Sequence, residues 1–395
     1  MVLIQKPKGT KDYFDIDSAK LTYLENKLAA ISFNYGFTKI TFPVFENEEL
    51  FRRTTGEGTD IVDKEMYTFL DKGGRNLSLR PEGTASVSRL LIENKLIFRN
   101  EEKRYFYLEK MYRYERPQKG RQREFFQFGV EFFNANSIYN DLEIIDLAIT
   151  ILDELKINNY VLKINSIGSS ESRKKYQEAL KTYLLKYELS LSQESQNRLN
   201  KNIFRILDSK QDIDKELLKN APKISDFLSN KEAQDFDFIK RKLLENNISF
   251  EVDLYLVRGL DYYNDLVFEF IEKDSNLTII GGGRYDTLIS MLQPNLIVKA
   301  IGFAIGIERI LNLINIESPK VNYYIASTSK NPQIFDILKN EANLKRKNNI
   351  SVITDFKTNK YDSLFKLAKY HNCENLLLLD FQEEKNLKKI IISID

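Results

Sequence analysis

The sequence predicts a protein of the α+β class, with a large N-terminal domain at 1–317 and a small α/β domain at 318–395. Three observations predict it. Residues 104–134 read as two long antiparallel strands around a loop that contains proline and glycine. Residues 170–248 have a polar, helical pattern without glycine, as expected for a helical insertion between two halves of a sheet domain. From residue 320 on, short apolar strands alternate with helical segments, which is typical of a small parallel α/β domain.

The large domain should begin with an amphipathic helix at 17–36, because its apolar residues recur at helical spacing. The other elements expected in this domain are a strand starting at 37 and ending at Pro43, the strand pair of 104–134, a helix at 141–155, strands at 160–168, 250–272 and 277–286, and a helix at 306–314. The small domain should contain strands at 321–327, 350–355, 374–380 and 388–394 and helices at 331–347 and 361–371.

Composition excludes several classes of site. The 59 Lys and Arg nearly balance the 57 Asp and Glu, so total charge does not indicate a nucleic-acid partner. We see neither a membrane-spanning apolar run nor a signal peptide, and we expect a cytoplasmic protein without membrane contact. Cys373 and His371 are the single cysteine and histidine, which excludes an intrachain disulfide and a protein metal site built from His and Cys. We expect His371 to be a surface or helix-capping residue, so the chemistry should depend on Arg, Glu, Gln and Tyr.

The strand pair of 104–134 separates a polar face from an apolar one. Alternate side chains of a strand share a face. One face of the second strand carries Phe125, Gln127, Gly129 and Glu131, and the other, which we assign to the core, carries Phe126, Phe128, Val130 and Phe132. On the first strand Arg113 and Glu115 share a face, so hairpin pairing should bring them to the polar face of the second. We expect Gly129 to leave room for a ligand there.

The loop of this hairpin is strongly basic. Residues 103–123 contain eight Lys or Arg against two Glu, a net of +6. Such a run is usually a solvated loop. Here an aromatic ring, Phe125, lies on the polar face beside the arginines. The ring could stack on a base while guanidinium groups bind phosphates, so the constellation suits a nucleotide.

The stretch "YRYE" at 112–115, followed by Arg121 and Phe125, resembles motif 2 of the class II aminoacyl-tRNA synthetases. The longer string "RYERPQKGRQREFFQFGVE" is similar to the histidyl-tRNA synthetase family in particular. Further matching stretches follow in order along nearly the whole chain: "KGTKDY", "GEGTDIVDKEMYTF", "LSLRPEGTA", "LKINSIGS", "FRILDSK", "LVRGLDYY", "GGGRYD" and, as motif 3, "GFAIGIERI".

The resemblance implies a histidine–tRNA ligase with a class II catalytic domain and a C-terminal anticodon-binding domain. Such an enzyme activates L-histidine with ATP, accompanied by Mg²⁺, to histidyl-adenylate and transfers it to the 3′ end of tRNA-His. No prosthetic group is expected. The resemblance also implies a homodimer formed through motif 1, here around "FTKITFPVFEN".

The resemblance also assigns residues to roles. Arg113 and Arg258 are the expected catalytic residues, because the attack of a carboxylate on a phosphate brings two anions together. The expected ATP-binding residues are Arg113, Glu115, Arg121, Phe125 and Arg309. The expected histidine-binding residues are Glu82, Thr84, Arg113, Gln127, Glu131, Arg258, Tyr262 and Tyr263. The residues expected to face the tRNA acceptor end are Arg116, Gln118, Lys119 and Arg123.

Some assignments remain open. Thr84 could instead cap a helix, and Tyr285 could be a core residue. We expect Gly281, Gly282 and Gly283 to let backbone close over the histidine pocket. The chain departs from the family pattern at Phe126, where bacterial members commonly have histidine, at Leu266, where threonine is usual, and in its short C-terminal domain, which could weaken anticodon binding.

Two other functions compete with the ligase. One is the synthetase-like regulatory subunit of ATP phosphoribosyltransferase, which usually lacks the anticodon domain and has a degraded motif 2. In this chain the residues of motif 2 are present and a C-terminal α/β domain follows, which argues against the regulatory subunit. The other is a pure RNA-binding protein, which would not explain Glu131 or the "RGLDYY" segment.

Overall fold

The computed structural model describes residues 3–56, 59–98, 101–117, 120–316, 319–357, 360–382 and 386–394. The chain divides into two compact units, one formed by residues 1–13 and 21–315 and the other by 14–20 and 316–395. None of the helices in the described ranges has the length and apolar character needed to cross a membrane.

The larger unit is built on an eight-stranded sheet in the order β1-β5-β6-β11-β10-β9-β7-β8. Its strands are β1 (Thr38–Lys39), β5 (Lys103–Tyr112), β6 (Glu124–Phe133), β7 (Tyr160–Ser166), β8 (Glu251–Val252), β9 (Asn264–Glu272), β10 (Leu277–Arg284) and β11 (Ala300–Gly306). The six central strands pair antiparallel, and the two edge strands pair parallel to their neighbours. A second sheet of three strands contains β2 (Phe45–Asn47), β3 (Thr68–Leu70) and β4 (Asn76–Leu79). The sequence prediction missed β11, although this strand lies in the middle of the larger sheet.

The expected strand from 37 to Pro43 is wrong as a single element. Pairing to β5 stops after Lys39, and strand structure resumes at Phe45 in the three-stranded sheet. The hairpin of β5 and β6 is confirmed, with Tyr112 opposite Glu124.

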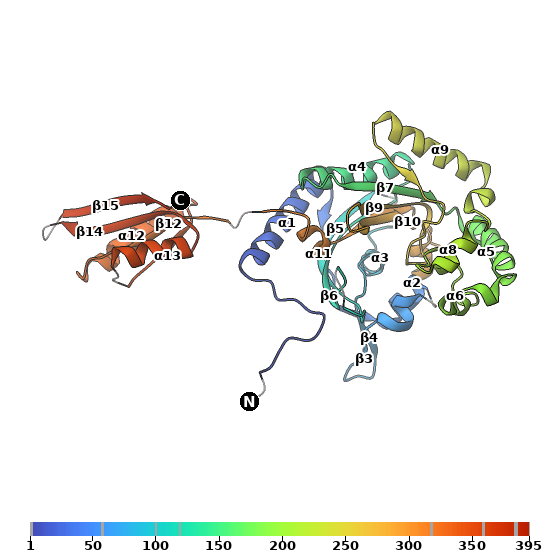
Figure 1. Ribbon diagram of the computed structural model, residues 1–395, viewed down its shortest axis with the longest axis horizontal. Coiled ribbons are helices and arrows are strands. Elements are labelled where there is room, and N and C mark those ends of the chain that lie inside the picture. The colour runs from blue at the N-terminus through green and yellow to red at the C-terminus, as the bar shows by residue number, and fades with distance from the viewer. Residues whose placement is uncertain are drawn as a thin grey trace. The chain divides into compact units, whose positions relative to one another are not determined.

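Helices cover both faces of the large sheet (Figure 1). The helical elements of this part of the chain are α1 (Asp15–Asn34), α2 (Glu48–Thr55), the π-helical turn η1 (Ile61–Glu65), α3 (Thr84–Glu93), α4 (Tyr139–Glu154), α10 (Leu288–Leu292) and α11 (Ile307–Leu311). The first residue of α3 bonds to Glu131, so α3 lies on the face that carries the polar residues of β6. On the opposite face Arg104 packs over the Phe132 ring and bonds to Glu143 of α4.

The described elements between 170 and 245 are all helical, as predicted. They are α5 (Ser170–Leu185), η2 (Glu188–Ser190), α6 (Gln193–Arg198), α7 (Phe204–Leu207), α8 (Asp212–Leu218), η3 (Ile224–Phe227) and α9 (Asn230–Glu245). Their apolar side chains form a separate small core that includes Tyr176, Leu180 and Ile206. The insertion therefore has a hydrophobic core of its own.

The smaller unit contains a four-stranded sheet in the order β13-β12-β14-β15, with apolar cores on both faces. Its elements are β12 (Val321–Ala326), α12 (Ile334–Lys347), β13 (Val352–Thr354), α13 (Tyr361–Tyr370), β14 (Cys373–Gln382) and β15 (Asn386–Ser393). Two of its three strand pairings are parallel, as predicted. The third differs from the prediction, because β15 runs antiparallel to β14. His371 is the C-cap of α13 and stacks on Tyr324, which confirms a capping role.

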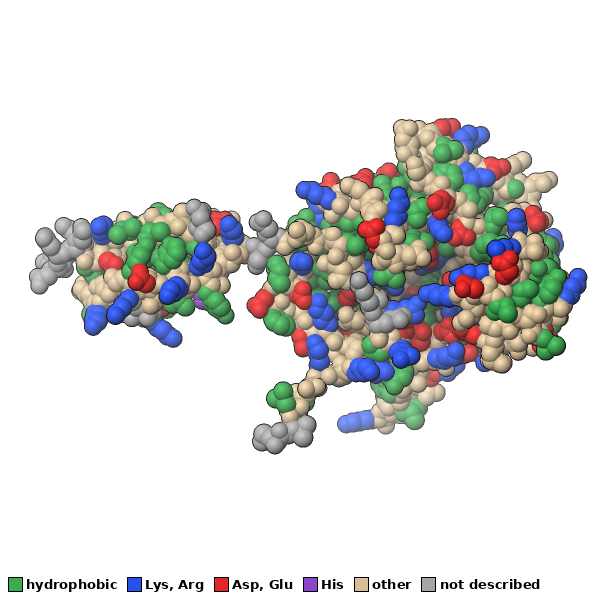
Figure 2. Space-filling model, viewed as in Figure 1, with side chains coloured by type: hydrophobic (Ala, Val, Ile, Leu, Met, Phe, Trp, Pro, Cys, Tyr) green, Lys and Arg blue, Asp and Glu red, His purple; other side chains and the backbone are tan. Residues whose placement is uncertain are grey.

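Over the face of the larger unit seen in Figure 2, Lys and Arg side chains are interspersed with Asp and Glu. This agrees with the near balance of basic and acidic residues in the sequence.

Candidate active site

A cavity of about 330 Å³ opens on the polar face of the large sheet. The predicted ATP-binding residues all line it: Arg113, Glu115, Arg121, Phe125 and Arg309. Gln127 and Arg258 line it as well. The structure therefore brings together side chains from the β5–β6 hairpin, the loop before β9 and the start of α11. These four guanidinium groups, with that of Arg205, which also lines the cavity, make it suited to a polyanion.

Two of these arginines belong to the hairpin. Strand β5 ends at Tyr112, so Arg113 and Glu115 reach the cavity from the loop rather than by strand alternation. The Arg113 Nε donates to the carbonyl of Pro81 at 2.8 Å, and its guanidinium lies 5.3 Å from the centre of the Phe125 ring. Arg121 lies 3.4 Å from the Glu115 carboxylate. The arginines are thus held beside an aromatic ring and a carboxylate.

The other two arginines approach from the β9–β10 side. Arg258 forms an ion pair with Glu269 of β9 and occupies the space over Gly281, where any side chain would collide with its guanidinium. Arg309 donates to the carbonyl of Thr278, and burial together with the nearby charge of Arg121 lowers the pKa of Arg309. The expectation for Gly281 needs correction, because this glycine makes room for Arg258 rather than for backbone closing over histidine.

Gly129 also has a different role from the one expected. The space that its missing side chain leaves is filled by Tyr107, which is fully buried. The Tyr107 hydroxyl is 3.2 Å from Oε1 of Gln127, to which it donates. The glycine therefore admits a tyrosine of the neighbouring strand, and that tyrosine in turn holds a predicted ligand-binding side chain.

Glu131 is the centre of a cluster of buried, hydrogen-bonded side chains (the Glu131 pocket) on the same face of the sheet, although none of them lines this cavity. Its side chain accepts a hydrogen bond from Thr84 Oγ1 at 2.7 Å and a short one from the Tyr285 hydroxyl. Burial raises the pKa of Glu131 to about 8, although these hydrogen bonds act in the opposite direction. Tyr285 is thus a buried core residue, as considered from the sequence, and also a hydrogen-bond partner of Glu131.

Glu82 caps the helix that begins beside Glu131. Its carboxylate accepts from the backbone N–H groups of Thr84 at 2.7 Å and Ala85 at 2.9 Å. Burial raises the pKa of Glu82. The capping role that we considered for Thr84 is met by Glu82, and the Thr84 hydroxyl is directed to Glu131 instead.

The two predicted tyrosines join the pocket to the cavity. Tyr262 and Tyr263 are buried with ring centres 4.8 Å apart, and the Tyr262 hydroxyl is 3.5 Å from Glu82. The Arg258 guanidinium lies 5.8 Å from the centre of the Tyr263 ring. Tyr263 therefore lies against an arginine that lines the cavity.

Of the four residues predicted to face tRNA, the structure describes Arg116 and Arg123. Arg116 is exposed, and Gln118 and Lys119 lie outside the described residues. Arg123 stacks on Tyr114 at 4.0 Å, and its Nε donates to the carbonyl of Glu115 at 3.4 Å. Arg123 is therefore held against the hairpin.

Two of the three departures from the family pattern, Phe126 and Leu266, do not line the cavity. Phe126 is on the face opposite Phe125, as predicted, but the core assignment is wrong because it is only partly buried, between Tyr13 and Lys110. Leu266 is buried within β9.

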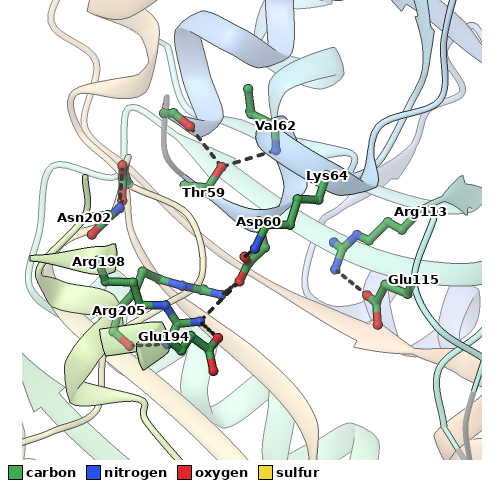
Figure 3. A network of polar contacts seen from close by, with 12 residues as sticks. Thr59, Asp60, Val62, Lys64, Arg113, Glu115, Glu194, Arg198, Asn202 and Arg205 are labelled. Carbon is green, nitrogen blue, oxygen red and sulfur yellow. Dashed lines mark hydrogen bonds and ion pairs between the residues drawn. The ribbon is translucent and has the colours of Figure 1, made fainter. Parts of the chain in front are cut away.

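Sequence reasoning gave no role to Asp60 or Arg205, which also line the cavity. Figure 3 shows Asp60 facing Arg198 and Arg205 of the insertion. The Asp60 carboxylate is 2.5 Å from Arg205 and 3.6 Å from Arg198. Burial alone would raise the pKa of Asp60, but the charge and hydrogen bond of Arg205 and those of Lys64 together outweigh burial and lower this pKa. The pair joins segments 145 positions apart, so sequence spacing could not have found it.

Comparisons with known proteins agree on one family. The family model described as histidyl-tRNA synthetase matches residues 9–310. A histidine–tRNA ligase of Ureaplasma parvum serovar 3 is 44% identical over 411 residues, which cover 99% of this chain and 95% of that protein. The apo structure of S. aureus histidyl-tRNA synthetase is similar with a TM-score of 0.80 and 30% identity, covering 99% of this chain and 98% of that one.

A third structure relates to the competing function. It is described as an ATP phosphoribosyltransferase regulatory subunit/histidyl-tRNA synthetase from Bacillus halodurans, with a TM-score of 0.70 and 21% identity, over 97% of this chain and all of that one. At this identity the likeness shows the fold alone.

Proposed function

The chain belongs to the histidyl-tRNA synthetase family, and on that premise we propose that it is a histidine–tRNA ligase, an aminoacyl-tRNA synthetase. Its first step joins L-histidine to ATP as histidyl-adenylate and releases pyrophosphate. Its second step transfers the histidyl group to the 3′ end of tRNA-His and releases AMP. The observation that carries the proposal is an arginine-lined cavity on the same face of the sheet as the buried, hydrogen-bonded Glu131, with Arg258 of the cavity beside Tyr263.

In the first step the histidine carboxylate attacks the α-phosphate of ATP. Two anions approach each other, so positive charge is needed where they meet. We assign Arg113 and Arg258 to this point as catalytic residues, Arg113 from the hairpin and Arg258 from the loop before β9. Both line the cavity, and Arg258 is also the arginine beside the Tyr263 ring.

ATP itself would extend through the cavity. Phe125 is assigned to stack on adenine, and Glu115 to accept from the adenine amino group. Arg121 and Arg309 are assigned to the terminal phosphates. In the residues that the structure describes, no cluster of three or more His, Cys, Asp or Glu side chains could hold a metal ion. Mg²⁺ is proposed to enter with ATP, bound to its phosphate oxygens, as part of the substrate.

Histidine would bind in the buried pocket. Glu131 and Tyr263 are assigned to the two imidazole nitrogens, with Tyr262 beside them, because a carboxylate and a phenol can give each nitrogen a partner. Glu82, Thr84 and Gln127 are assigned to the α-amino group. Since Glu131 accepts from Thr84 and Tyr285 in this structure, binding of the imidazole must share or replace one of these hydrogen bonds.

In the second step a ribose hydroxyl of the tRNA attacks the adenylate carbonyl. Arg116 is exposed and can meet phosphates of the acceptor end, and Gln118, Lys119 and Arg123 are assigned to the same end. The smaller unit is proposed to bind the anticodon. We place the domain boundary near residue 317 and propose a cytoplasmic homodimer that uses the segment 37–47, where Val44 and Phe45 are exposed.

Histidine-dependent exchange of pyrophosphate into ATP tests the first step directly. We expect exchange with histidine and none without it. Aminoacylation of tRNA-His, with an anticodon-mutated tRNA as comparison, tests the second step and the role of the smaller unit. A folded protein that showed no exchange would contradict the ligase and favour a non-catalytic member of the fold.

A further inference from the structure

One short region of the helical insertion contacts two separate segments at the cavity. Arg205 of α7 bonds to Asp60 at 2.5 Å, and Arg198 supports the same carboxylate. Between them, Asn202 donates to both carboxylate oxygens of Asp261, at 3.0 and 3.2 Å. Figure 3 shows Arg198, Asn202 and Arg205 on one side of Asp60, with Arg113 on the other. The insertion thus bonds to the segment 59–65 and to the loop before β9 at the same time.

The contact at Asp60 leads to the first catalytic arginine. Asp60 directly precedes the tight turn η1, which ends at Glu65. The carbonyl of Glu65 accepts a hydrogen bond of 2.6 Å from the backbone N–H of Tyr114. Tyr114 is the residue next to Arg113, so a shift of Asp60 would be transmitted through one turn to the backbone that carries Arg113.

The contact at Asp261 leads to the second catalytic arginine. Asp261 lies three positions after Arg258 in the same loop. Arg173, at the start of the insertion, donates to the carbonyls of Asp261 at 2.9 Å and Tyr263 at 2.7 Å. The insertion therefore fixes this loop at a side chain and at two carbonyl groups.

We propose that the insertion is a brace that sets the distance between the two catalytic arginines, with Asp60 and Arg205 as positioning residues for adenylate formation. This inference rests on the proposed ligase function. The arginines belong to segments far apart in the chain. The backbone N–H of Arg113 bonds to Arg123 at the end of the hairpin, whereas Arg258 lies in the loop before β9, so pairing within the sheet does not by itself set the distance between them. Displacement of such a group by about 1 Å can lower a rate by about a hundredfold. A shared support that touches both loops would prevent that displacement.

The test uses Asp60→Asn, Arg205→Gln and the double variant in full-length protein. Each single change should lower kcat of histidine-dependent exchange by about tenfold, because the arginines lose alignment in the transition state. The KM values for histidine and ATP should stay within about twofold, because ground-state binding is retained. The double variant should be no slower than the singles, since both remove the same contact. The reciprocal exchange Asp60→Arg with Arg205→Asp should recover part of the rate.

Glu194→Gln is the matched control, because Glu194 pairs with Arg198 at 2.5 Å on its exposed side and does not line the cavity. This variant should keep the wild-type kcat. Additive losses in the double variant, or an equal loss in Glu194→Gln, would overturn the brace. The brace would also be overturned if Arg205→Gln raised the KM for ATP while Asp60→Asn kept wild-type kinetics, because Arg205 would then contact ATP directly. Wild-type exchange in the same assay tests the ligase function separately. If a single variant fails to fold, Asn202→Ala tests the other end of the brace by the same kcat and KM criteria.

Discussion

The arginine-lined cavity and the Glu131 pocket lie on one face of the sheet, but they would bind their ligands by different interactions. In the cavity the side chain of Arg121 is 46% exposed, and its charge meets water as well as Glu115. In the pocket Glu131 is 2% exposed, and both carboxylate oxygens accept hydrogen bonds from protein groups. One site offers positive charge to a polyanion in a cavity that is partly exposed to solvent, whereas the other offers hydrogen-bonding groups that the fold holds in place and buries.

This difference assigns the strength of ATP binding to the cavity and the selectivity for the amino acid to the pocket. A phosphate chain gains from any correctly spaced cation, and water and salt weaken that gain. A buried acceptor rejects a ligand that cannot donate to it, because the acceptor would be left without a partner. We therefore expect the pocket to select histidine and the cavity to drive the reaction of whatever the pocket holds. Arg258 lies where the two sites meet.

The largest effect should come from Arg258→Ala, which removes positive charge at this junction. Loss of one such group costs on the order of 10³-fold in rate, so exchange should become barely detectable. Histidine binding, measured by calorimetry, should remain measurable because the Glu131 pocket is intact. Arg75→Ala is the matched control, since Arg75 pairs with Asp71 on an exposed hairpin. Near-normal exchange in Arg258→Ala would refute its catalytic role.

Glu131→Gln should have the next largest effect and should act on histidine alone. An amide has one acceptor oxygen, whereas Glu131 accepts from Thr84 and Tyr285 and would also serve the imidazole. We expect kcat/KM for histidine to fall by about 10²-fold, the cost of leaving one buried hydrogen-bonding group without its partner. The KM for ATP should stay unchanged. If the KM values for both substrates rose equally, the pocket and the cavity would not be separate sites.

The sequence predicted which residues line the cavity better than it predicted which side chains pack against the glycines nearby. Their chemistry follows from residue type and motif spacing, and the side chains named for ATP do line one cavity. Contacts between distant segments could not be read in this way. Tyr107 fills the space at Gly129 and Arg258 the space at Gly281, and a glycine in a sequence does not reveal its occupant.

Strand prediction failed where alternation gave no signal. The segment "AIGFAIG" of β11 has no polar residue and is buried at most positions, so it lacks the alternation of a half-exposed strand. The segment after Phe37 alternates, yet it changes from one sheet to another near Pro43. The local sequence pattern showed neither which sheet a strand joins nor the residue at which the chain passes from one sheet to the other.

A third prediction concerns stability and sharpens the contrast in burial. The folded-state pKa of Glu131 is about 8, above its ordinary value of 4.5, so folding is favoured while this group keeps its proton. That contribution is complete below the ordinary pKa and is lost as pH rises through about 8. Between about pH 7 and pH 8.5 the free energy of unfolding of wild type should fall by about 1 kcal/mol relative to Glu131→Gln. Urea unfolding of both proteins measures this difference, in which other titrating groups cancel. Parallel pH profiles would contradict the assignment of this titration to Glu131.

The smallest effect should come from salt, and it tests the comparison without any mutation. Raising ionic strength from about 0.1 M to about 0.5 M shortens the screening length and weakens exposed charge interactions, so the KM for ATP should rise by about twofold. The KM for histidine should hardly change, because Glu131 and its partners are shielded from the solvent. Potassium chloride at constant free Mg²⁺ keeps the substrate form of ATP fixed. If both KM values rose together, the histidine pocket would depend on exposed charge as much as the cavity does. If neither moved, the cavity arginines would bind phosphate through contacts already closed to water.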